Sequence, residues 1–180
     1  NLLWKQSVGG LKWRVGTTDV LFIDTALSLA RLTGYAVLVR KSADQSISTA
    51  EVYAVLSWQV EQYDQGALHD TVTNNGRLTA PVAGIYHVSL NVMWDSSAVG
   101  IRGVHILQNV AGVNQWVASE EDTSIAYMRQ AVSADVYLAA GDFVLAMGYN
   151  GDGGAAHSVL ASRVMTGGTF YSNFEMHKLA

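Results

Sequence analysis

The sequence predicts an all-β protein built as an antiparallel sandwich or jelly roll, and three observations support this fold class. Hydrophobic residues make up 49% of the chain and charged residues 14%, a composition that can bury a core. Residues 85–94 alternate strictly, as a half-buried strand does. The residues of its apolar face are Tyr86, Val88, Leu90, Val92 and Trp94. Turn residues then recur between the alternating segments with no convincing helix between them.

The first part of the chain, residues 1–42, is predicted to hold short strands. They lie at Leu11–Gly16, Val20–Asp24 and Tyr35–Arg40, separated by turn residues. A helix over Asp24–Leu32 is the alternative for the intervening segment. Strands this short and few cannot close a hydrophobic core. We therefore expect this segment to need the following domain, or copies of itself from other chains.

The second part, residues 43–180, is predicted to be one domain of longer strands. Turn chemistry separates them, and Pro81, the only proline, stands where a missing N–H breaks no ladder. The long segment Gly151–Gly168 before the last strand is interpreted as a loop. The predicted strands are Val52–Val60, Thr71–Ala80, Ile85–Trp94, Gly100–Asn109, Asn114–Ser119, Ser124–Leu138, Asp142–Asn150 and Thr169–Leu179.

Large apolar residues inside these alternating patterns are the candidates for the core or for contacts between subunits. A low charged fraction is also typical of chains that bury apolar surface against other subunits. The candidates are Trp58, Tyr86, Val88, Leu90, Val92, Trp94, Phe143, Leu145 and Phe174.

Several classes of function are disfavoured by composition. The net charge of −4 argues against nucleic acid as a partner, since phosphate binding needs clustered Lys and Arg. No apolar run reaches the ~18 residues of a membrane span, so no membrane insertion is expected. The absence of cysteine excludes disulfides and thiolate chemistry. Because the chain opens at Asn1 with no initiator Met, we expect a C-terminal fragment of a longer protein.

No catalytic residue, metal ligand or cofactor is predicted. There is no Gly-x-Ser-x-Gly elbow and no phosphate-binding glycine loop. The five histidines lack metal-ligand spacing, although His87 and His105 lie on neighbouring predicted strands. The loop Asn150–Gly154 resembles an oxygen-rich calcium loop only in part, which leaves calcium open there or at a trimer axis.

Two motifs resemble a known superfamily. They are Leu78-Thr79-Ala80-Pro81-Val82-Ala83-Gly84-Ile85-Tyr86 and Leu138-Ala139-Ala140-Gly141-Asp142-Phe143-Val144-Leu145, and the final segment Thr169–Met176 is similar to its last strand. The sequence over roughly residues 45–180 resembles the tumour-necrosis-factor/complement jelly-roll superfamily, especially the complement-type globular head and its phage-borne relatives. The resemblance implies a homotrimer with no catalytic residues.

The first forty residues resemble the end of a phage tail-fibre or virion-fibre shaft. The segments that carry the resemblance are Leu11–Asp19 and Val39–Ser46. It implies a fibre stem over residues 1–42 followed by a globular head over residues 43–180. It also implies an outward-facing place on the virion, and contact with other virion proteins through a preceding N-terminal part.

Counting strands forward places the loops at two ends of the head. Pro81–Gly84, Val110–Val113 and Ala139–Gly141 are expected beside the stem, together with the C-terminus. The loops Tyr63–Asp70, Asp95–Val99, Ser119–Thr123 and Asn150–Gly168 are expected at the far tip. Binding residues often lie on such loops. The candidates for binding a host receptor are Tyr63, Asp64, Asp70, Asp95, Trp116, Glu120, Glu121, Asp122, Asp152 and Arg163.

Three functions stay open at this point. In the first, the head binds a cell-surface receptor, either a glycan or a protein. In the second, it only trimerises and caps the fibre. In the third, it cleaves host polysaccharide, which needs two carboxyl groups held at a fixed separation. Glu120, Glu121 and Asp122 would have to supply that pair, and on a predicted loop they are better interpreted as solvated charges.

Overall fold

The chain is built of strands. The computed structural model describes residues 2–7, 10–15, 18–24, 34–48, 52–97, 99–123 and 125–179, and these contain seventeen strands and no helix. Contacts divide the chain into two compact units, Asn1–Gly34 and Tyr35–Ala180.

The first unit contains a three-stranded antiparallel meander in the order β1-β2-β3. Its register pairs Trp4 with Trp13, and an irregularity occurs between Trp13 and Arg14. The strands predicted here are therefore confirmed, with shifted bounds. The alternative helix begins at Asp24, which is the last residue of β3, and its remaining residues lie outside the described ones. The bounds are β1 (Leu2–Ser7), β2 (Gly10–Val15) and β3 (Thr18–Asp24).

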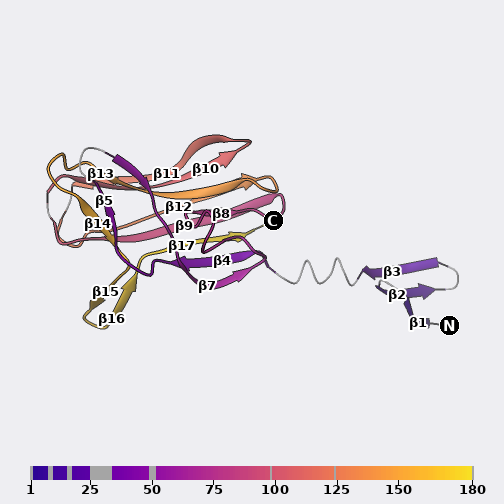
Figure 1. Ribbon diagram of the computed structural model, residues 1–180. Helices are drawn as coiled ribbons and strands as arrows, with labels where there is room; N and C mark the ends of the chain where they lie inside the picture. The colour runs from indigo at the N-terminus through magenta and orange to yellow at the C-terminus, as the bar shows by residue number, and fades with distance from the viewer. Residues whose placement is uncertain are drawn as a thin grey trace. The chain divides into compact units, whose positions relative to one another are not determined.

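The second unit is a sandwich of two antiparallel sheets (Figure 1). The first, which we call sheet I, has the order β11-β10-β13-β6, with β8 also pairing with β13. The turn between β10 and β11 is Ala111-Gly112, whose φ angles of 51° and 84° suit a two-residue hairpin. The bounds are β6 (Val52–Val55), β8 (Arg77–Thr79), β10 (Ile101–Val110), β11 (Val113–Thr123) and β13 (Phe143–Asn150).

The second sheet, sheet II, has β9 at its centre. On one side β9 pairs with β12. On its other side β9 pairs with β14 at Met93 and Trp94 and with β17 over Tyr86–Asn91, and all three partners run antiparallel to it. In the same way β5 pairs with β14, while β4 pairs with β17 and β7. The bounds are β4 (Ala36–Arg40), β5 (Gln45–Ile47), β7 (Val60–Gln65), β9 (Gly84–Trp94), β12 (Arg129–Leu138), β14 (His157–Leu160) and β17 (Asn173–Lys178).

A separate hairpin, β15 (Ser162–Met165) with β16 (Gly168–Tyr171), connects β14 to β17. It projects away from the two sheets (Figure 1). The segment Gly151–Gly168 was predicted to be a loop, and that prediction is wrong, since it contains β14, β15 and the start of β16. Its Gly- and Ala-rich first part hid the short alternating strands that come after it.

The boundary between the two units lies earlier than the predicted one between residues 42 and 43. Val37 and Val39 of β4 are fully buried in the sandwich, and β4 pairs with the last strand of the chain. Residues 35–42 therefore contribute to the core of the second unit and belong to it.

The core lies between sheets I and II. Of the predicted core residues, Trp58, Tyr86, Val88, Leu90, Val92, Trp94 and Phe174 have no exposed surface. The Trp58 ring stacks on Phe174 with centroids 5.8 Å apart. Phe143 and Leu145 alternate with the buried Val144 and Ala146, so they lie half-buried on the outward face of sheet I instead.

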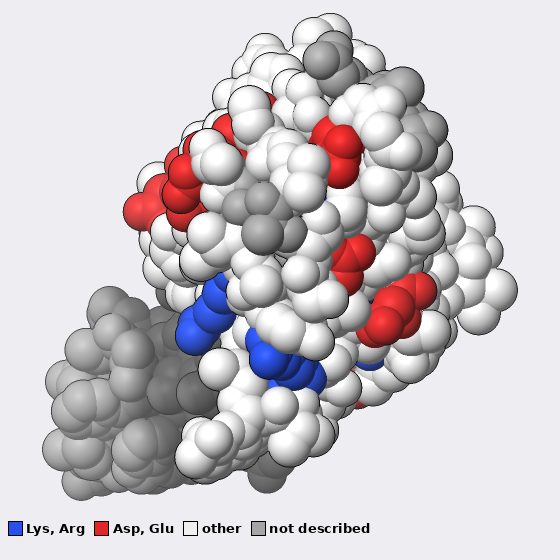
Figure 2. Space-filling view, turned by 90° about the vertical axis from the view of Figure 1, so that its left-hand side faces the viewer, with Lys and Arg blue, Asp and Glu red and all other residues white. Residues whose placement is uncertain are grey.

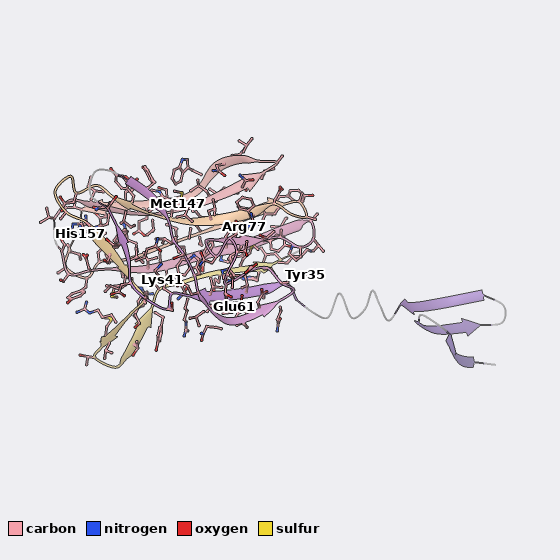
Figure 3. The ribbon with its side chains drawn as sticks, in the orientation of Figure 1. Tyr35, Lys41, Glu61, Arg77, Met147 and His157 are labelled. Atoms are coloured by element: carbon pink, nitrogen blue, oxygen red, sulfur yellow. The ribbon has the colours of Figure 1, made fainter. Side chains whose placement is uncertain are left out.

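The near end of the sandwich is where residue 35 enters and the chain finishes. Lys178 N donates to Tyr35 O, and Leu179 N donates to Ile85 O. Figure 3 shows Tyr35 and His157 at opposite ends of the unit, and we call the end with His157 the far end. The expected return of the C-terminus to the side where the chain enters is therefore confirmed.

The two superfamily-like motifs meet at the near end. Ala80 N donates to Asp142 O and Gly141 N donates to Ala80 O, both at 2.8 Å. Asp142 Oδ1 also accepts from Ala111 N at 3.3 Å, so the three loops predicted there lie together. Tyr86 fixes the turn after Pro81, since its hydroxyl donates to Val82 O at 2.7 Å.

The predicted strand Val52–Val60 is in fact two strands in different sheets. Its alternation is continuous because Leu56 and Trp58 are buried while the chain crosses from β6 to β7. This extra crossing reverses the direction of the chain beyond it, so that Gln65 of β7 pairs with Ala36 at the near end. The expectation that the loop Tyr63–Asp70 lies at the far tip is therefore wrong.

Most of the predicted strand Thr71–Ala80 is a turn, and only β8 remains of it. Asp70 Oδ1 accepts from the N–H groups of Val72 and Thr73 at 2.8 and 2.9 Å. Such local side-chain bonds compete with a strand ladder. Asn74, with φ 60°, then adopts a left-handed conformation that ends any extended run.

We expect Gly148→Ala to destabilise the sandwich by about 1–3 kcal/mol, because extra volume in a packed core forces its neighbours aside. An added Cβ would lie 2.5 Å from Ile47 Cδ1 and 3.3 Å from the Trp94 ring. Gly153→Ala is the matched control, since nothing lies within 4 Å of that position. Thermal denaturation of both variants checks this, and equal melting temperatures would contradict it.

Candidate functional site

The acidic residues predicted to form one tip are spread over the molecule. Tyr63, Asp64 and Asp70 lie with β7 and the loop after it, toward the near end. Asp64 caps that loop, because its carboxylate accepts from Leu68 N and His69 N, each at 3.0 Å. Figure 2, which faces the far end, shows Asp and Glu side chains in separate groups, with Lys and Arg elsewhere on the same face.

Glu120, Glu121 and Asp122 lie on a strand, where a loop was predicted. They form the end of β11 and pair with the start of β10. Because successive side chains of a strand point to opposite faces, Glu120 and Glu121 diverge. Glu120 Oε2 accepts from Ala131 N of β12 at 2.9 Å, whereas Glu121 faces the aromatic side chains on sheet I. Adjacent carboxylates arranged in this way do not form a facing pair.

The far end does bring Asp95 and Asp152 together, through a buried histidine. His157 Nδ1 lies 3.2 Å from Asp95 Oδ1, and His157 Nε2 lies 2.9 Å from Asp152 Oδ2. Only an imidazolium has protons for both carboxylates. The guanidinium of Arg102 is fully buried in the same region; burial lowers its pKa, and the charges of Asp95 and Asp152 oppose that change in part. No spacing in the sequence predicted that His157 or Arg102 would lie with these aspartates.

In the loop Asn150–Gly154, side-chain oxygens accept hydrogen bonds from backbone N–H groups of the same loop. Asn150 Oδ1 accepts from Asp152 N at 3.0 Å, and Asp152 Oδ1 accepts from Gly154 N at 2.9 Å. Asp152 Oδ2 is the atom that faces His157. Within the described residues no group of three His, Asp or Glu side chains is arranged to hold a metal ion. Calcium at this loop remains a prediction, which a melting-temperature shift on adding EDTA would test.

We expect acid to weaken this cluster. The hydrogen bond from His157, followed by that from Gly154 N, lowers the pKa of Asp152 below its ordinary value of 3.8. The stabilisation is therefore complete above about pH 4 and is lost as pH falls through the lower, folded-state pKa. Asp152→Asn and His157→Gln should each flatten the loss of unfolding free energy between pH 4 and pH 2, measured by urea denaturation. A profile identical to that of the unmodified protein in both variants would contradict this.

Arg163 belongs to the β15–β16 hairpin, and its guanidinium lies 3.2 Å from the centroid of the Tyr127 ring. Two other arginines stack around the same hairpin, Arg129 over Phe170 and Arg40 over Tyr171. These contacts fix the base of a hairpin whose Val164 is largely exposed. Within the described residues Arg163 thus contacts an aromatic ring and forms no ion pair with the carboxylates with which it was grouped.

Trp116, one of the predicted binding residues, belongs to a group that the sequence did not indicate, and Glu121, another, borders it. The sheet I aromatic cluster, as we call it, consists of Tyr53, His105, Trp116 and Tyr149. Each comes from a different strand, namely β6, β10, β11 and β13. Trp116 and Tyr53 are 53% and 44% exposed, whereas His105 beneath them is buried. Large exposed rings gathered on a rigid sheet are typical of a binding surface.

His87 and His105 do lie on consecutive strands, β9 and β10, but the two strands do not pair, so the histidines do not meet across a sheet. The chain changes sheets between β9 and β10, so His87 belongs to sheet II and His105 to sheet I. His87 Nδ1 lies 2.7 Å from Asp135 Oδ1, and its ring contacts that of His177.

The described residues contain no helix that is long and apolar enough to cross a membrane.

Comparison with known proteins shows the fold. No family model and no curated protein matches the sequence. Among solved structures, murine APRIL at pH 5.0 is similar with a TM-score of 0.58 at 12% identity, covering 81% of this chain and 99% of that one. Eiger TNF from S. frugiperda gives 0.54 at 17%, covering 82% and 94%. The globular domain of zebrafish complement 1qA gives 0.51 at 15%, covering 82% and 98%.

These structures and the topology together define the class of fold. The second unit is an antiparallel jelly roll of the tumour-necrosis-factor and complement type. The fold that the sequence predicted is thereby confirmed. At such low identity the likeness shows architecture and carries no site from those proteins to this one.

Proposed function

We propose that this chain is a non-enzymatic recognition module, the homotrimeric head and part of the stem of a phage virion fibre, which binds a receptor on the host surface. The observation that carries the proposal is the sheet I aromatic cluster. Its rings hold one another in place, and Trp116 and Tyr53 remain open to solvent, so they offer a preformed apolar surface. The place on the virion and the phage context rest on the resemblance of the stem and head sequences.

The outward face of sheet II suits the contact between subunits. It carries the exposed side chains of Ile85, Tyr137 and Tyr63. Its polar groups bond to each other, because His87 faces Asp135 and Ser89 Oγ donates to Glu175 Oε1 at 2.7 Å. Polar groups satisfied within the sheet can be covered by another subunit without being left unpaired. Trimerisation through this face would leave sheet I free for the receptor.

Two alternative functions have less support. The divergence of Glu120 and Glu121 disfavours glycan cleavage at the site where the sequence placed a carboxylate pair. A head that only trimerises and caps the fibre would need no exposed rings on sheet I, and that role becomes the better account if no receptor is found.

Binding of the fluorescently labelled protein to a panel of bacterial strains tests the proposal. We expect saturable binding to some strains, and release of the label by excess unlabelled protein. An enzyme would instead shorten the surface polysaccharide of those strains during incubation. Absence of binding across the panel would contradict receptor recognition.

A further inference from the structure

The sheet I aromatic cluster is assembled by strand register. Straight across four strands, Glu121 is opposite Gly103, Gly103 is opposite Tyr149, and Tyr149 is opposite Tyr53. The next row on the same face places Ser119 opposite His105 and His105 opposite Met147, which is labelled on this sheet in Figure 3. All these side chains share the outward face, because residues two apart on a strand point the same way.

The rings support one another. Tyr53 stacks on Tyr149 with centroids 4.6 Å apart and planes 29° apart. Trp116 reaches across β10, lying 4.8 Å from the ring of His105 and 5.3 Å from that of Tyr53. Tyr149 and His105 thus fill the space below, and Trp116 and Tyr53 keep their free surface outward. Little side-chain entropy remains to be lost when a ligand covers them.

Polar atoms border this apolar surface. Glu121 Oε1 accepts from Tyr53 Oη at 3.4 Å and lies 3.4 Å from His105 Nε2, without hydrogen-bond geometry to the latter. His105 Nδ1 is already engaged with Ser119 Oγ at 2.7 Å. The buried Nε2 atom therefore has no hydrogen-bond partner within the described residues. The edge of the cluster therefore offers a carboxylate and a phenol to a polar ligand, while the imidazole of His105 lies buried beneath them.

Glycine is required at the centre of this border. A Cβ at Gly103 would lie 2.7 Å from Glu121 Cγ, 2.8 Å from His105 Nε2 and 3.2 Å from Tyr149 Cβ. The missing side chain at position 103 lets the carboxylate, the imidazole and the ring approach each other. The same apolar face continues along β6 to the exposed Val55, which lines a surface pocket of about 270 Å³ with Arg77 and Phe143.

We infer that the sheet I aromatic cluster binds a neutral saccharide. A pyranose ring has an apolar C–H face that fits against exposed aromatic surface, and hydroxyl groups at its rim that can hydrogen-bond to the Glu121 carboxylate and the Tyr53 phenol. No Lys or Arg belongs to the cluster, and Glu121 would repel a phosphate, sulfate or acidic sugar. The continuation past Val55 gives room for a further sugar unit, and the guanidinium of Arg77 there lies over the Phe143 ring, 4.7 Å from its centroid. This inference rests on the proposed function and names the ligand class of its receptor.

An array of neutral and acidic oligosaccharides, probed with the whole protein, tests this inference. We expect retention of neutral hexose-containing oligosaccharides, and titration of one of them should show at least about tenfold weaker binding for Trp116→Ala and for Tyr53→Ala. Val164→Ala is the control, because it removes a more exposed apolar side chain from the β15–β16 hairpin, outside both sheet I and sheet II. Unchanged melting temperatures show that the variants are folded. If Trp116→Ala is not folded, the less disruptive Trp116→Phe takes its place.

Three results would overturn the inference. One is retention of acidic oligosaccharides only. Another is a lower solution mass for Trp116→Ala, which would make the cluster a contact between subunits. The third is undiminished binding of Trp116→Ala and Tyr53→Ala to strains that bind the unmodified protein. That result would keep the proposed function but place the receptor-binding surface outside the sheet I aromatic cluster. Failure of the unmodified protein to bind any strain would instead contradict the proposed function itself.

Discussion

Replacing Trp94 with alanine should lower the free energy of unfolding by about 3–5 kcal/mol, the range for losing a large buried ring. Trp94 ends the central strand β9 and has no exposed surface. Its Nε1 donates to Gln130 Oε1 at 2.8 Å, and Gln130 Nε2 in turn donates to Arg102 O at 3.0 Å. The substitution would therefore leave a cavity between the sheets together with an unpaired buried amide oxygen.

Urea denaturation measures this loss, and two further variants locate its cause. Trp94→Phe keeps much of the volume but removes the N–H donor, so we expect a smaller loss of about 1–3 kcal/mol. Trp116→Ala makes the same chemical change at a half-exposed ring, and should cost clearly less than Trp94→Ala. Equal losses for Trp94→Ala and Trp116→Ala would contradict the position of the core between sheets I and II.

The second large effect concerns Lys41, whose side chain is buried beside Trp58. Its Nζ donates to Gln45 Oε1 at 2.5 Å and to Ser57 O at 2.9 Å. Burial lowers the pKa of Lys41 from 10.5 to about 8, and the charge of Asp44 opposes that change in part. A charged lysine at this position therefore opposes folding.

The free energy of unfolding should rise with pH between 8 and 10.5. Below pH 8 both the folded and the unfolded chain hold the proton, so the cost of burying the charge is present in full. Between the two pKa values the unfolded chain binds more protons, and stability rises by as much as about 3 kcal/mol. Lys41→Met should remove this rise, whereas Lys178→Met, at a partly exposed site, should keep it. A rise that survives in Lys41→Met would rule out Lys41 as its source.

The strands that were predicted well are those whose pattern had a single interpretation. Strand β9 alternates from Ile85 to Val92, because one face is buried in the core and the other is only partly covered. Strand β6 and the segment after it also alternate, yet the chain changes sheets there, since burial of Leu56 and Trp58 continues the same period. Periodicity records burial and does not record which sheet a strand joins. One missed crossing reversed the assignment of the loop Tyr63–Asp70.

Charge misled the prediction at β11. Three consecutive acidic residues, Glu120, Glu121 and Asp122, are typical of a loop, but β11 is an edge strand of sheet I. Edge strands carry charge because it discourages pairing with other chains. Trp116 and the three residues before it are all exposed, so the alternation of buried and exposed residues is weak in this part of β11.

The candidate site was only partly accessible from sequence. Trp116 and Glu121 were among the predicted binding residues, while Tyr53, His105 and Tyr149 were not. Their meeting depends on the register of four strands far apart in the chain, and register is set by packing and turn geometry. A local signal did exist, because Tyr53 and Tyr149 fall at the outward positions of their strands.

The solution mass of the protein, measured by light scattering coupled to size exclusion, tests the trimeric recognition head most directly. The account predicts a mass near three times 19.4 kDa, with the outward face of sheet II covered between subunits. Tyr137→Ala and Ile85→Ala should then lower the fraction of trimer. A stable monomer of 19.4 kDa would contradict the homotrimer and, with it, the assignment of this chain to a fibre.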